Sequence, residues 1–127
     1  EEQLRPIVSL VSFGFKHGVP GGSDLLFDVR FLSNPYFEEG LRELSGQDAA
    51  VRQFLESHDE YEELIHRLVD FLGFLLPRYR RENRAYLSIA VGCTGGRHRS
   101  VCVAEELAVR LGKSGWSGRV FHRDIER

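Results

Sequence analysis

The sequence predicts an α/β domain built on a small mixed or parallel sheet that is flanked by helices. Short runs rich in β-branched and aromatic residues alternate along the chain with stretches of helical periodicity. One of the strand-like runs also passes through a glycine-rich loop directly into a helix. With 127 residues, 42% of them hydrophobic and 28% charged, the chain has the size and composition of one domain that buries its own core. We therefore expect residues 1–127 to form a single domain.

The first half of the chain is expected to supply two strands and a short helix. Ile7–Phe13 and Leu25–Arg30 are the β-rich runs, with a glycine-containing loop between them. The irregular stretch 31–46 is too long for a simple connection, and long loops in compact domains are often functional. Ser45, followed three residues later by Asp48, resembles a capping box, so a helix should begin directly after it.

The second half is expected to supply two helices and two further strands. Apolar residues recur every three or four positions over Asp59–Asn83, where Pro77 should kink or end the helix. Tyr86–Val91 is predicted to be a strand, a helix follows over about His98–Leu111, and Arg119–Arg123 is predicted to be the last strand.

The charge is divided unequally between the two halves. Residues 1–77 carry 6 Lys and Arg against 14 Asp and Glu, whereas residues 78–127 carry 11 against 5. Of the 17 cationic residues, 15 are Arg, and the Arg side chain is well suited to binding phosphates. A basic half fits an anionic partner. Arg in ordinary surface roles explains the composition as well, and from composition alone that is the stronger interpretation.

Several classes of protein are excluded by what the sequence lacks. No apolar run reaches the roughly 18 residues of a membrane span, and no secretory signal is present. Cys93 and Cys102 form neither a CxxC pair nor a zinc-ligand series, so we expect no metal, no cofactor and a cytoplasmic location. Because the chain begins with Glu1 and contains no Met, we expect it to be a piece of a longer protein.

The glycine-rich loop Gly92–Ser100 (GCTGGRHRS) is the feature that predicts a binding site. Glycines let the backbone approach a ligand, and the first amides of the following helix point outward without partners. A loop of this kind binds anions, and Arg97, His98 and Arg99 add positive charge. The pattern is neither a Walker loop nor the dinucleotide fingerprint. The alternative is a tight turn whose glycines serve only packing.

The same loop contains the pattern Cys-x5-Arg, formed by Cys93 and Arg99 and followed by Ser100. It resembles the phosphate loop of the cysteine-dependent phosphatases, in which a thiolate attacks phosphorus and the arginine binds the phosphoryl oxygens. Gly92 stands where those enzymes usually carry His, and no WPD-like acid loop is present, which leaves Asp28 as the candidate general acid. Phosphatase activity is therefore the alternative function.

Three segments in order, SFGFKHGVP, FDVRFLSNP and GCTGGRHRSV, are similar to the C-terminal domain of the RapZ/YvcJ family. The resemblance covers about Ile7 to Arg123. Family members normally place a Walker-type nucleotide-binding domain before this one, and that half is absent here. The resemblance implies a non-catalytic regulatory domain that senses glucosamine-6-phosphate. It also implies that the domain binds a small regulatory RNA, presents this RNA to an endoribonuclease and assembles as a homo-oligomer.

The resemblance also implies which residues bind these partners. The loop would hold the phosphoryl group, while residues of the DVRFLSNP segment would read sugar hydroxyls or an amine. The implied ligand-binding residues are Cys93, Thr94, Gly95, Gly96, His98, Arg99, Ser100, Asp28, Arg30 and Asn34. A local ion pair between Asp28 and Arg30, and a turn at Asn34, are equally good explanations of those three residues.

RNA binding would rest on scattered basic residues, because the chain ends in Asp-Ile-Glu-Arg where RapZ carries a basic tail. The implied RNA-binding residues are Lys16, Arg97, Arg119 and Arg123, together with the cluster Arg78–Arg84.

Four other side chains are given smaller roles. Cys102 lies on an apolar helix face and is expected to be buried and inert. Phe71 and Phe74 are expected in the core or, if exposed, in an oligomer contact. His122 is a candidate to approach the anion loop from the last strand.

Overall fold

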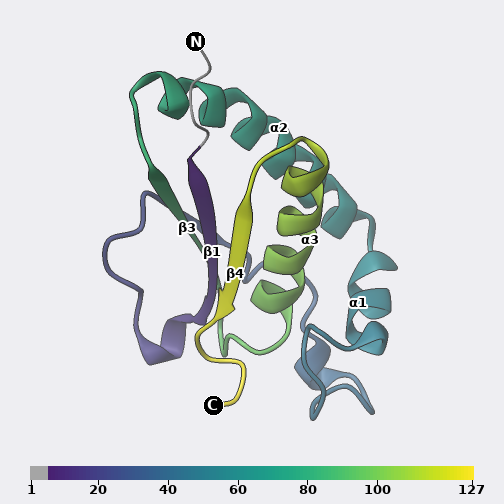
Figure 1. The fold of residues 1–127 in the computed structure, drawn as a ribbon. Helices are drawn as coiled ribbons and strands as arrows, with labels where there is room; N and C mark the ends of the chain where they lie inside the picture. Colours follow the sequence, from purple (N-terminus) through teal and green to yellow (C-terminus); the bar gives the residue numbers. More distant parts are fainter. Residues whose placement is uncertain (1–5) are drawn as a thin grey trace.

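The structure, a computed structural model that describes residues 6–127, is a four-stranded sheet with helices packed over one of its faces (Figure 1). The strands and helices, in chain order, are β1 (Ile7–Gly14), η1 (Phe15–His17), β2 (Leu25–Asp28), η2 (Pro35–Phe37), α1 (Ala49–Glu56), α2 (Asp59–Arg81), β3 (Tyr86–Cys93), α3 (Arg99–Lys113) and β4 (Gly118–His122). The predicted α/β class and the predicted order of the regular elements are confirmed.

The sheet is entirely parallel, with the strand order β2-β3-β1-β4. In register, Gly14 lies opposite Cys93, and Asp28 lies opposite Gly92. The carboxyl ends of all four strands therefore meet at one edge, the lower edge in Figure 1. The loops that follow β1, β2 and β3 and the segment after β4 are brought together there, although they are distant in sequence.

The core forms between the sheet and the helices. Alternate residues of β1 and β3, such as Leu10 and Ile89, are fully buried in one cluster with the apolar stripes of α2 and α3. Residues Ile65 and Leu72 of α2 and Leu107 of α3 are likewise buried in that cluster. Side chains at the intervening positions of the strands point to the other face. None of the three α-helices in the described residues covers that face, so the domain has two layers.

Cys102 is buried in this core, as predicted, where its sulfur lies 3.3 Å from the hydroxyl of Tyr61. Burial raises the pKa of the Cys102 thiol to about 11, so the thiol stays protonated near neutral pH. Phe71 and Phe74 instead lie on the outer side of α2 and are 44% and 54% exposed. Phe71 packs edge-on against Phe27 of β2.

The ends of the strands and helices differ from the predicted ones by one or two residues, and Pro77 does not end α2. Strand β2 ends at Asp28 rather than Arg30 because the Asp28 carboxylate accepts the backbone N–H of Arg30 and turns the chain. Helix α2 continues past Pro77 to Arg81. Leu76 is fully buried and Tyr79 packs against the core, so tertiary packing on either side of the proline outweighs the lost helical hydrogen bond.

No helix among residues 6–127 is long and apolar enough to cross a membrane.

Candidate functional site

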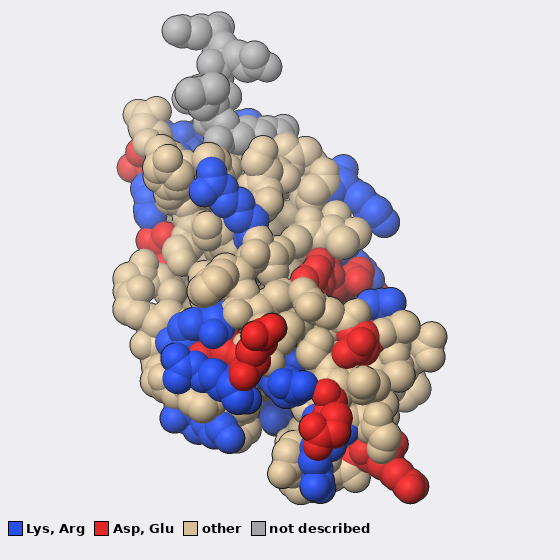
Figure 2. All heavy atoms as spheres, turned by 60° about the horizontal axis from the view of Figure 1, so that its bottom comes forward, with Lys and Arg blue, Asp and Glu red and all other residues tan. Residues whose placement is uncertain are grey.

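A pocket of about 320 Å³ opens over the Gly92–Ser100 loop at the carboxyl edge of the sheet. It is lined by Lys16, Asn34, Tyr36, Phe37, Arg42, Cys93, Thr94, Gly95, Arg97, His98, Arg99 and Arg127. Five of these residues are Lys or Arg, and none is Asp or Glu. Figure 2, which brings this edge forward, shows basic side chains gathered over it with a few acidic ones between them. The lining therefore favours an anionic ligand.

Two glycines of the site are required by close packing of the loop against the end of β1. A Cβ on Gly14 would lie 2.3 Å from the carbonyl carbon of Gly95, and one on Gly96 would lie 2.4 Å from the backbone nitrogen of Gly14. Gly96 also has a φ of 81°, a conformation that favours glycine. The packing interpretation of the loop is therefore right for Gly96.

Gly95 has a different explanation, because a Cβ on it would meet nothing within 4 Å. Its φ is not positive, and it lines the pocket. Neither packing nor backbone conformation requires glycine at this position. The missing side chain leaves space in the pocket, which is what the close approach of a ligand to the backbone needs.

Hydrogen-bond donors of the loop backbone are available to a ligand. The N–H groups of Gly95, Arg97 and His98 have no acceptor among the described residues. They directly precede α3, whose N-terminus carries a partial positive charge. The arrangement is thus able to hold an anion with several backbone donors.

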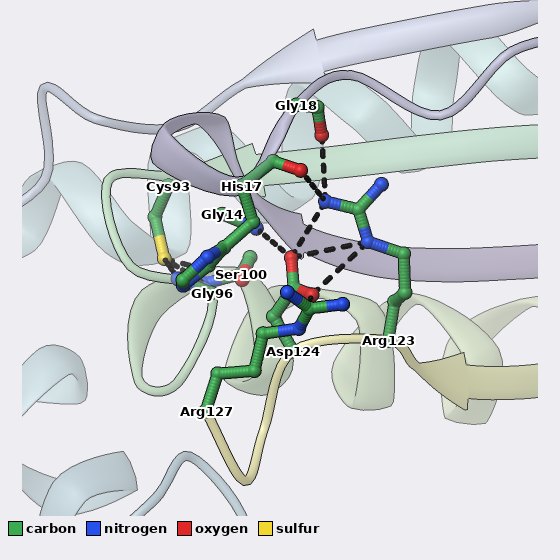
Figure 3. Close-up of polar contacts among 9 residues, drawn as sticks. All are labelled: Gly14, His17, Gly18, Cys93, Gly96, Ser100, Arg123, Asp124 and Arg127. Carbon is green, nitrogen blue, oxygen red and sulfur yellow. Dashed lines mark hydrogen bonds and ion pairs between the residues drawn. The ribbon is translucent and has the colours of Figure 1, made fainter.

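The sulfur of Cys93 lies at the floor of the loop, with three polar groups around it (Figure 3). The N–H of Gly96 donates to it at 3.3 Å and the N–H of Ser100 at 3.4 Å, and the Ser100 hydroxyl oxygen lies 3.1 Å away. Cys93 is 2% exposed but lines the pocket. The structure therefore brings together Cys93 and Ser100, two of the predicted loop residues.

Arg99 is buried and holds the loop after β2 in place. Its Nη1 donates to the carbonyl oxygens of Arg30 at 2.7 Å and Leu32 at 3.0 Å, and its Nη2 donates to the Thr94 hydroxyl at 3.4 Å. The Nε of Arg99 is buried and has no partner among the described residues. Arg99 thus has one unused donor at the site, while most of its donors hold the protein together.

Arg97 is used in the same way. It donates to the backbone carbonyl oxygens of Glu43 at 2.7 Å, Leu44 at 3.1 Å and Ile125 at 3.0 Å. His98 is 6% exposed, its Nε2 lies 3.2 Å from a backbone carbonyl oxygen of the 31–46 stretch, and burial lowers its pKa. His98 is consequently neutral near neutral pH and adds no charge to the pocket.

Two cationic side chains of the lining remain available for a ligand. The ammonium group of Lys16 has no hydrogen-bond or ion-pair partner in the part of the chain that the structure describes. Arg42 stacks over the ring of Tyr36 at 4.4 Å and donates through Nε to its carbonyl oxygen, which leaves both terminal nitrogens unused. Arg127, in contrast, is paired with Asp124.

The buried carboxylate of Asp124 joins the chain after β4 to the start of the loop after β1 (Figure 3). It is fully buried and accepts the N–H of Gly14 at 2.8 Å. Arg123 donates to both carboxylate oxygens, and Arg127 lies 3.0 Å from one of them. Burial alone would raise the pKa of Asp124, but hydrogen bonds from Arg123 and Gly14 outweigh it and hold the pKa below 3.8.

The loop after β2 brings Asp28, Arg30 and Asn34 to the same edge of the sheet. The structure contains both the ion pair between Asp28 and Arg30 and the turn at Asn34 that were the alternative explanations of these residues. The Arg30 guanidinium donates to both carboxylate oxygens of Asp28, and this hydrogen bonding holds the pKa of Asp28 below its usual value. Neither residue lines the pocket. Asn34 does line it, and its side-chain oxygen accepts the N–H of Tyr36 as the cap of η2.

The residues predicted to bind RNA are separated by the fold. Lys16 lies at the pocket, and Arg97 and Arg123 lie at the same edge but donate mostly to backbone carbonyls and to Asp124. Arg119 is near the start of β4, away from the loop. The cluster Arg78–Arg84 lies at the end of α2, where cations offset the helix dipole.

His122 does not approach the anion loop. Its Nδ1 lies 2.6 Å from the hydroxyl of Ser12 and its Nε2 lies 2.7 Å from the carboxylate of Glu105, which directs the ring toward α3. No group of His, Cys, Asp and Glu side chains able to hold a metal ion occurs within residues 6–127.

Sequence reasoning missed Tyr36, Phe37, Arg42 and Arg127 as lining residues of the pocket. The available signal was two consecutive aromatic residues after Asn-Pro in a loop of unusual length. The stretch reaches the pocket because Arg97 and His98 hold its carbonyl groups, a contact that has no signature in sequence.

Comparison with known proteins places these features in a family. The family model described as the RapZ C-terminal domain matches residues 6–126. A nucleotide-binding protein of Rubrobacter xylanophilus is 52% identical over 126 residues, which are 96% of this chain and 41% of that protein. One from Anaeromyxobacter dehalogenans (strain 2CP-C) is 52% identical, covering 94% of this chain and 41% of its own length, and one from Brevibacillus brevis is 48% identical, covering 99% and 43%. The chain thus spans less than half the length of these relatives.

Replacing each of the two adjacent loop glycines, Gly95 and Gly96, by alanine distinguishes a glycine required for packing from one required for ligand binding. Gly96→Ala should lower the free energy of unfolding by about 2 kcal/mol or more, because the new Cβ meets β1 and the positive φ becomes strained. Gly95→Ala should change it by no more than about 0.5 kcal/mol while weakening the binding of inorganic phosphate. Urea denaturation and calorimetry measure the two effects. Equal destabilisation by both variants would contradict the assignment of Gly95 to the pocket.

Asp124→Asn tests the buried carboxylate. Because its pKa is depressed in the folded state, its stabilising effect is complete above about pH 4 and is lost as pH falls through the folded-state pKa. The variant should be less stable by about 3 kcal/mol at pH 7, and its difference from wild type should shrink toward pH 2. Asp70→Asn, on an exposed carboxylate of α2, is the control and should have little effect. Thermal denaturation across this pH range measures both, and a pH-independent difference would refute the depressed pKa.

Proposed function

This chain belongs to the RapZ C-terminal domain family, and on that premise we propose that it binds a small phosphorylated ligand without turning it over. The observation that carries the proposal is the Gly92–Ser100 loop. Its residues Gly95, Arg97 and His98, whose backbone N–H groups have no acceptor among the described residues, line a pocket that has cationic side chains and no Asp or Glu. A phosphate monoester carries a charge near −2 and requires several hydrogen-bond donors. The loop backbone, the Thr94 hydroxyl, Arg99 Nε and Lys16 would supply them.

A phosphorylated amino sugar such as glucosamine-6-phosphate is the ligand that we propose. The phosphoryl group would lie over the loop, and the sugar would extend toward Asn34. Asp28 is the carboxylate that β2 brings to this edge, and it would receive the amine by exchanging part of its contact with Arg30. In this proposal, Asp28 pairs with Arg30 in the free domain and with the ligand's amine in the complex.

Binding of the ligand would be coupled to binding of a larger partner through charge. Lys16 belongs both to the pocket and to the surface that would contact a small RNA. Placing a phosphate beside it lowers the local positive potential, and nucleic-acid affinity depends strongly on such charges. We therefore propose that the ligand and RNA, or an acidic surface of an endoribonuclease, compete at this edge.

Assembly and location complete the proposal. The half-exposed rings of Phe71 and Phe74 support a contact between copies of the chain in a homo-oligomer. Both cysteines are free, which supports the reducing cytoplasm as the location. The names of the relatives give nucleotide binding to proteins more than twice as long as this chain.

Calorimetric titration with glucosamine-6-phosphate tests the function. Lys16→Ala should weaken binding roughly tenfold, because it removes a charged donor whose loss costs about 1.5 kcal/mol. It should leave the unfolding midpoint unchanged, since Lys16 holds no other group. Lys113→Ala, at the far end of α3, is the matched control. Arg99→Ala is unsuitable for this purpose because it also releases two backbone carbonyls. Absence of binding by the wild-type chain would refute the proposal.

The three polar groups around the Cys93 sulfur favour phosphatase activity as a second candidate, because they match what a nucleophilic thiolate requires. The candidate acid, Asp28, is held by Arg30 and does not line the pocket, so binding without turnover is the better-supported function. We expect no release of nitrophenolate from p-nitrophenyl phosphate and full phosphate binding by Cys93→Ser. Turnover that disappears in Cys93→Ser but persists in Cys102→Ser would establish the enzyme instead.

A further inference from the structure

The pocket has an aromatic wall that the proposed phosphate contacts do not use. Tyr36 and Phe37, here called the aromatic shelf, are 46% and 74% exposed, and both line the pocket. Exposing two adjacent rings to water is unfavourable. A pair of rings beside a cluster of donors is typical of a site for a ligand with one apolar, flat part and one polar part.

The shelf is held in a defined position rather than being a loose loop tip. The side chain of Asn34 accepts the N–H of Tyr36, Pro35 is buried, and the N–H of Phe37 donates to the Asn34 carbonyl oxygen. The two rings pack edge to face with their centroids 5.3 Å apart. Arg42 lies over the Tyr36 ring. Such a prearranged surface stacks a planar group at little cost in conformational entropy.

The charges of the residues that line the pocket indicate whether a planar ligand stacked on the shelf would be an anion or a cation. The side chains around the shelf and the loop are basic, neutral or aromatic, and no carboxylate lines the pocket. A planar cation would therefore find no ionic partner there, whereas a planar anion would find Lys16 and the terminal nitrogens of Arg42. A volume of about 320 Å³ falls in the range of small-molecule sites.

We propose that this pocket also takes a nucleoside monophosphate, with its phosphate over the Gly92–Ser100 loop and its base stacked on the aromatic shelf. This inference rests on the proposed function for the phosphate and adds a second ligand class that would compete with the phosphosugar. Base–aromatic stacking tolerates any base because every base has a π-face. Tyr36 and Phe37 are accordingly the residues that distinguish a nucleotide from a sugar phosphate.

Calorimetric titration with adenosine 5′-monophosphate beside ribose 5-phosphate tests the inference, since the nucleotide carries the base at the sugar carbon where ribose 5-phosphate carries a hydroxyl. Wild type should bind the nucleotide roughly tenfold more tightly than ribose 5-phosphate. Phe37→Ala and Tyr36→Ala should remove most of that difference and leave ribose 5-phosphate affinity within about twofold of wild type, and Tyr36→Phe should keep it. Tyr86→Ala, which removes an exposed ring at the start of β3 outside the pocket, is the matched control and should change neither affinity.

The outcomes separate this inference from the function on which it rests. Equal affinity for the two compounds in wild type would overturn the inference, while binding of both would still support the phosphate site. A nucleotide preference that survives Tyr36→Ala and Phe37→Ala, or that Tyr86→Ala abolishes, would also overturn it. If neither these compounds nor glucosamine-6-phosphate binds, the proposed function itself fails.

Discussion

The contact of backbone with backbone between Gly14 and the Gly95–Gly96 step is the constraint on which the site depends. Any side chain at Gly14 or Gly96 would collide with the opposite main chain. The parallel register of β1 and β3, which sets Gly14 opposite Cys93, brings these segments together. Because the contact is so close, the loop turns over the end of β1. The N–H groups of Gly95, Arg97 and His98 are left without acceptors among the described residues, and all three residues line the pocket.

Some of the cationic side chains around this loop hold other parts of the protein in place, and others have donors available for a ligand. Arg97 and Arg99 donate chiefly to backbone carbonyl groups, and Arg123 donates to the buried Asp124 carboxylate and to the carbonyl groups of His17 and Gly18. Arg97 and Arg99 line the pocket, whereas Arg123 lies outside its lining. Lys16 and Arg42 keep donors free for a ligand. A count of basic residues would therefore overstate how many contact an anion directly, because most of the guanidinium groups already have partners.

The fold class, the element order and the glycine-rich loop between β3 and α3 could be predicted from the sequence because each has a local signature in periodicity or in glycine spacing. Contacts between distant segments have no such signature. The burial that carries α2 past Pro77, the carbonyl groups bound by Arg97 and the placing of Tyr36 beside the loop all depend on tertiary structure. Asp28 and Arg30 show the same limit, since their ion pair was foreseeable while their position outside the pocket lining was not.

The central claim is that the Gly92–Ser100 loop is a preformed anion site, and an NMR titration of backbone amides with inorganic phosphate tests it most directly. If the loop is such a site, the amide resonances of Gly95, Arg97 and His98 shift together with one dissociation constant, while those of α2 stay unchanged. Shifts confined to the Arg78–Arg84 cluster, or none at all in the loop up to millimolar phosphate, would contradict it.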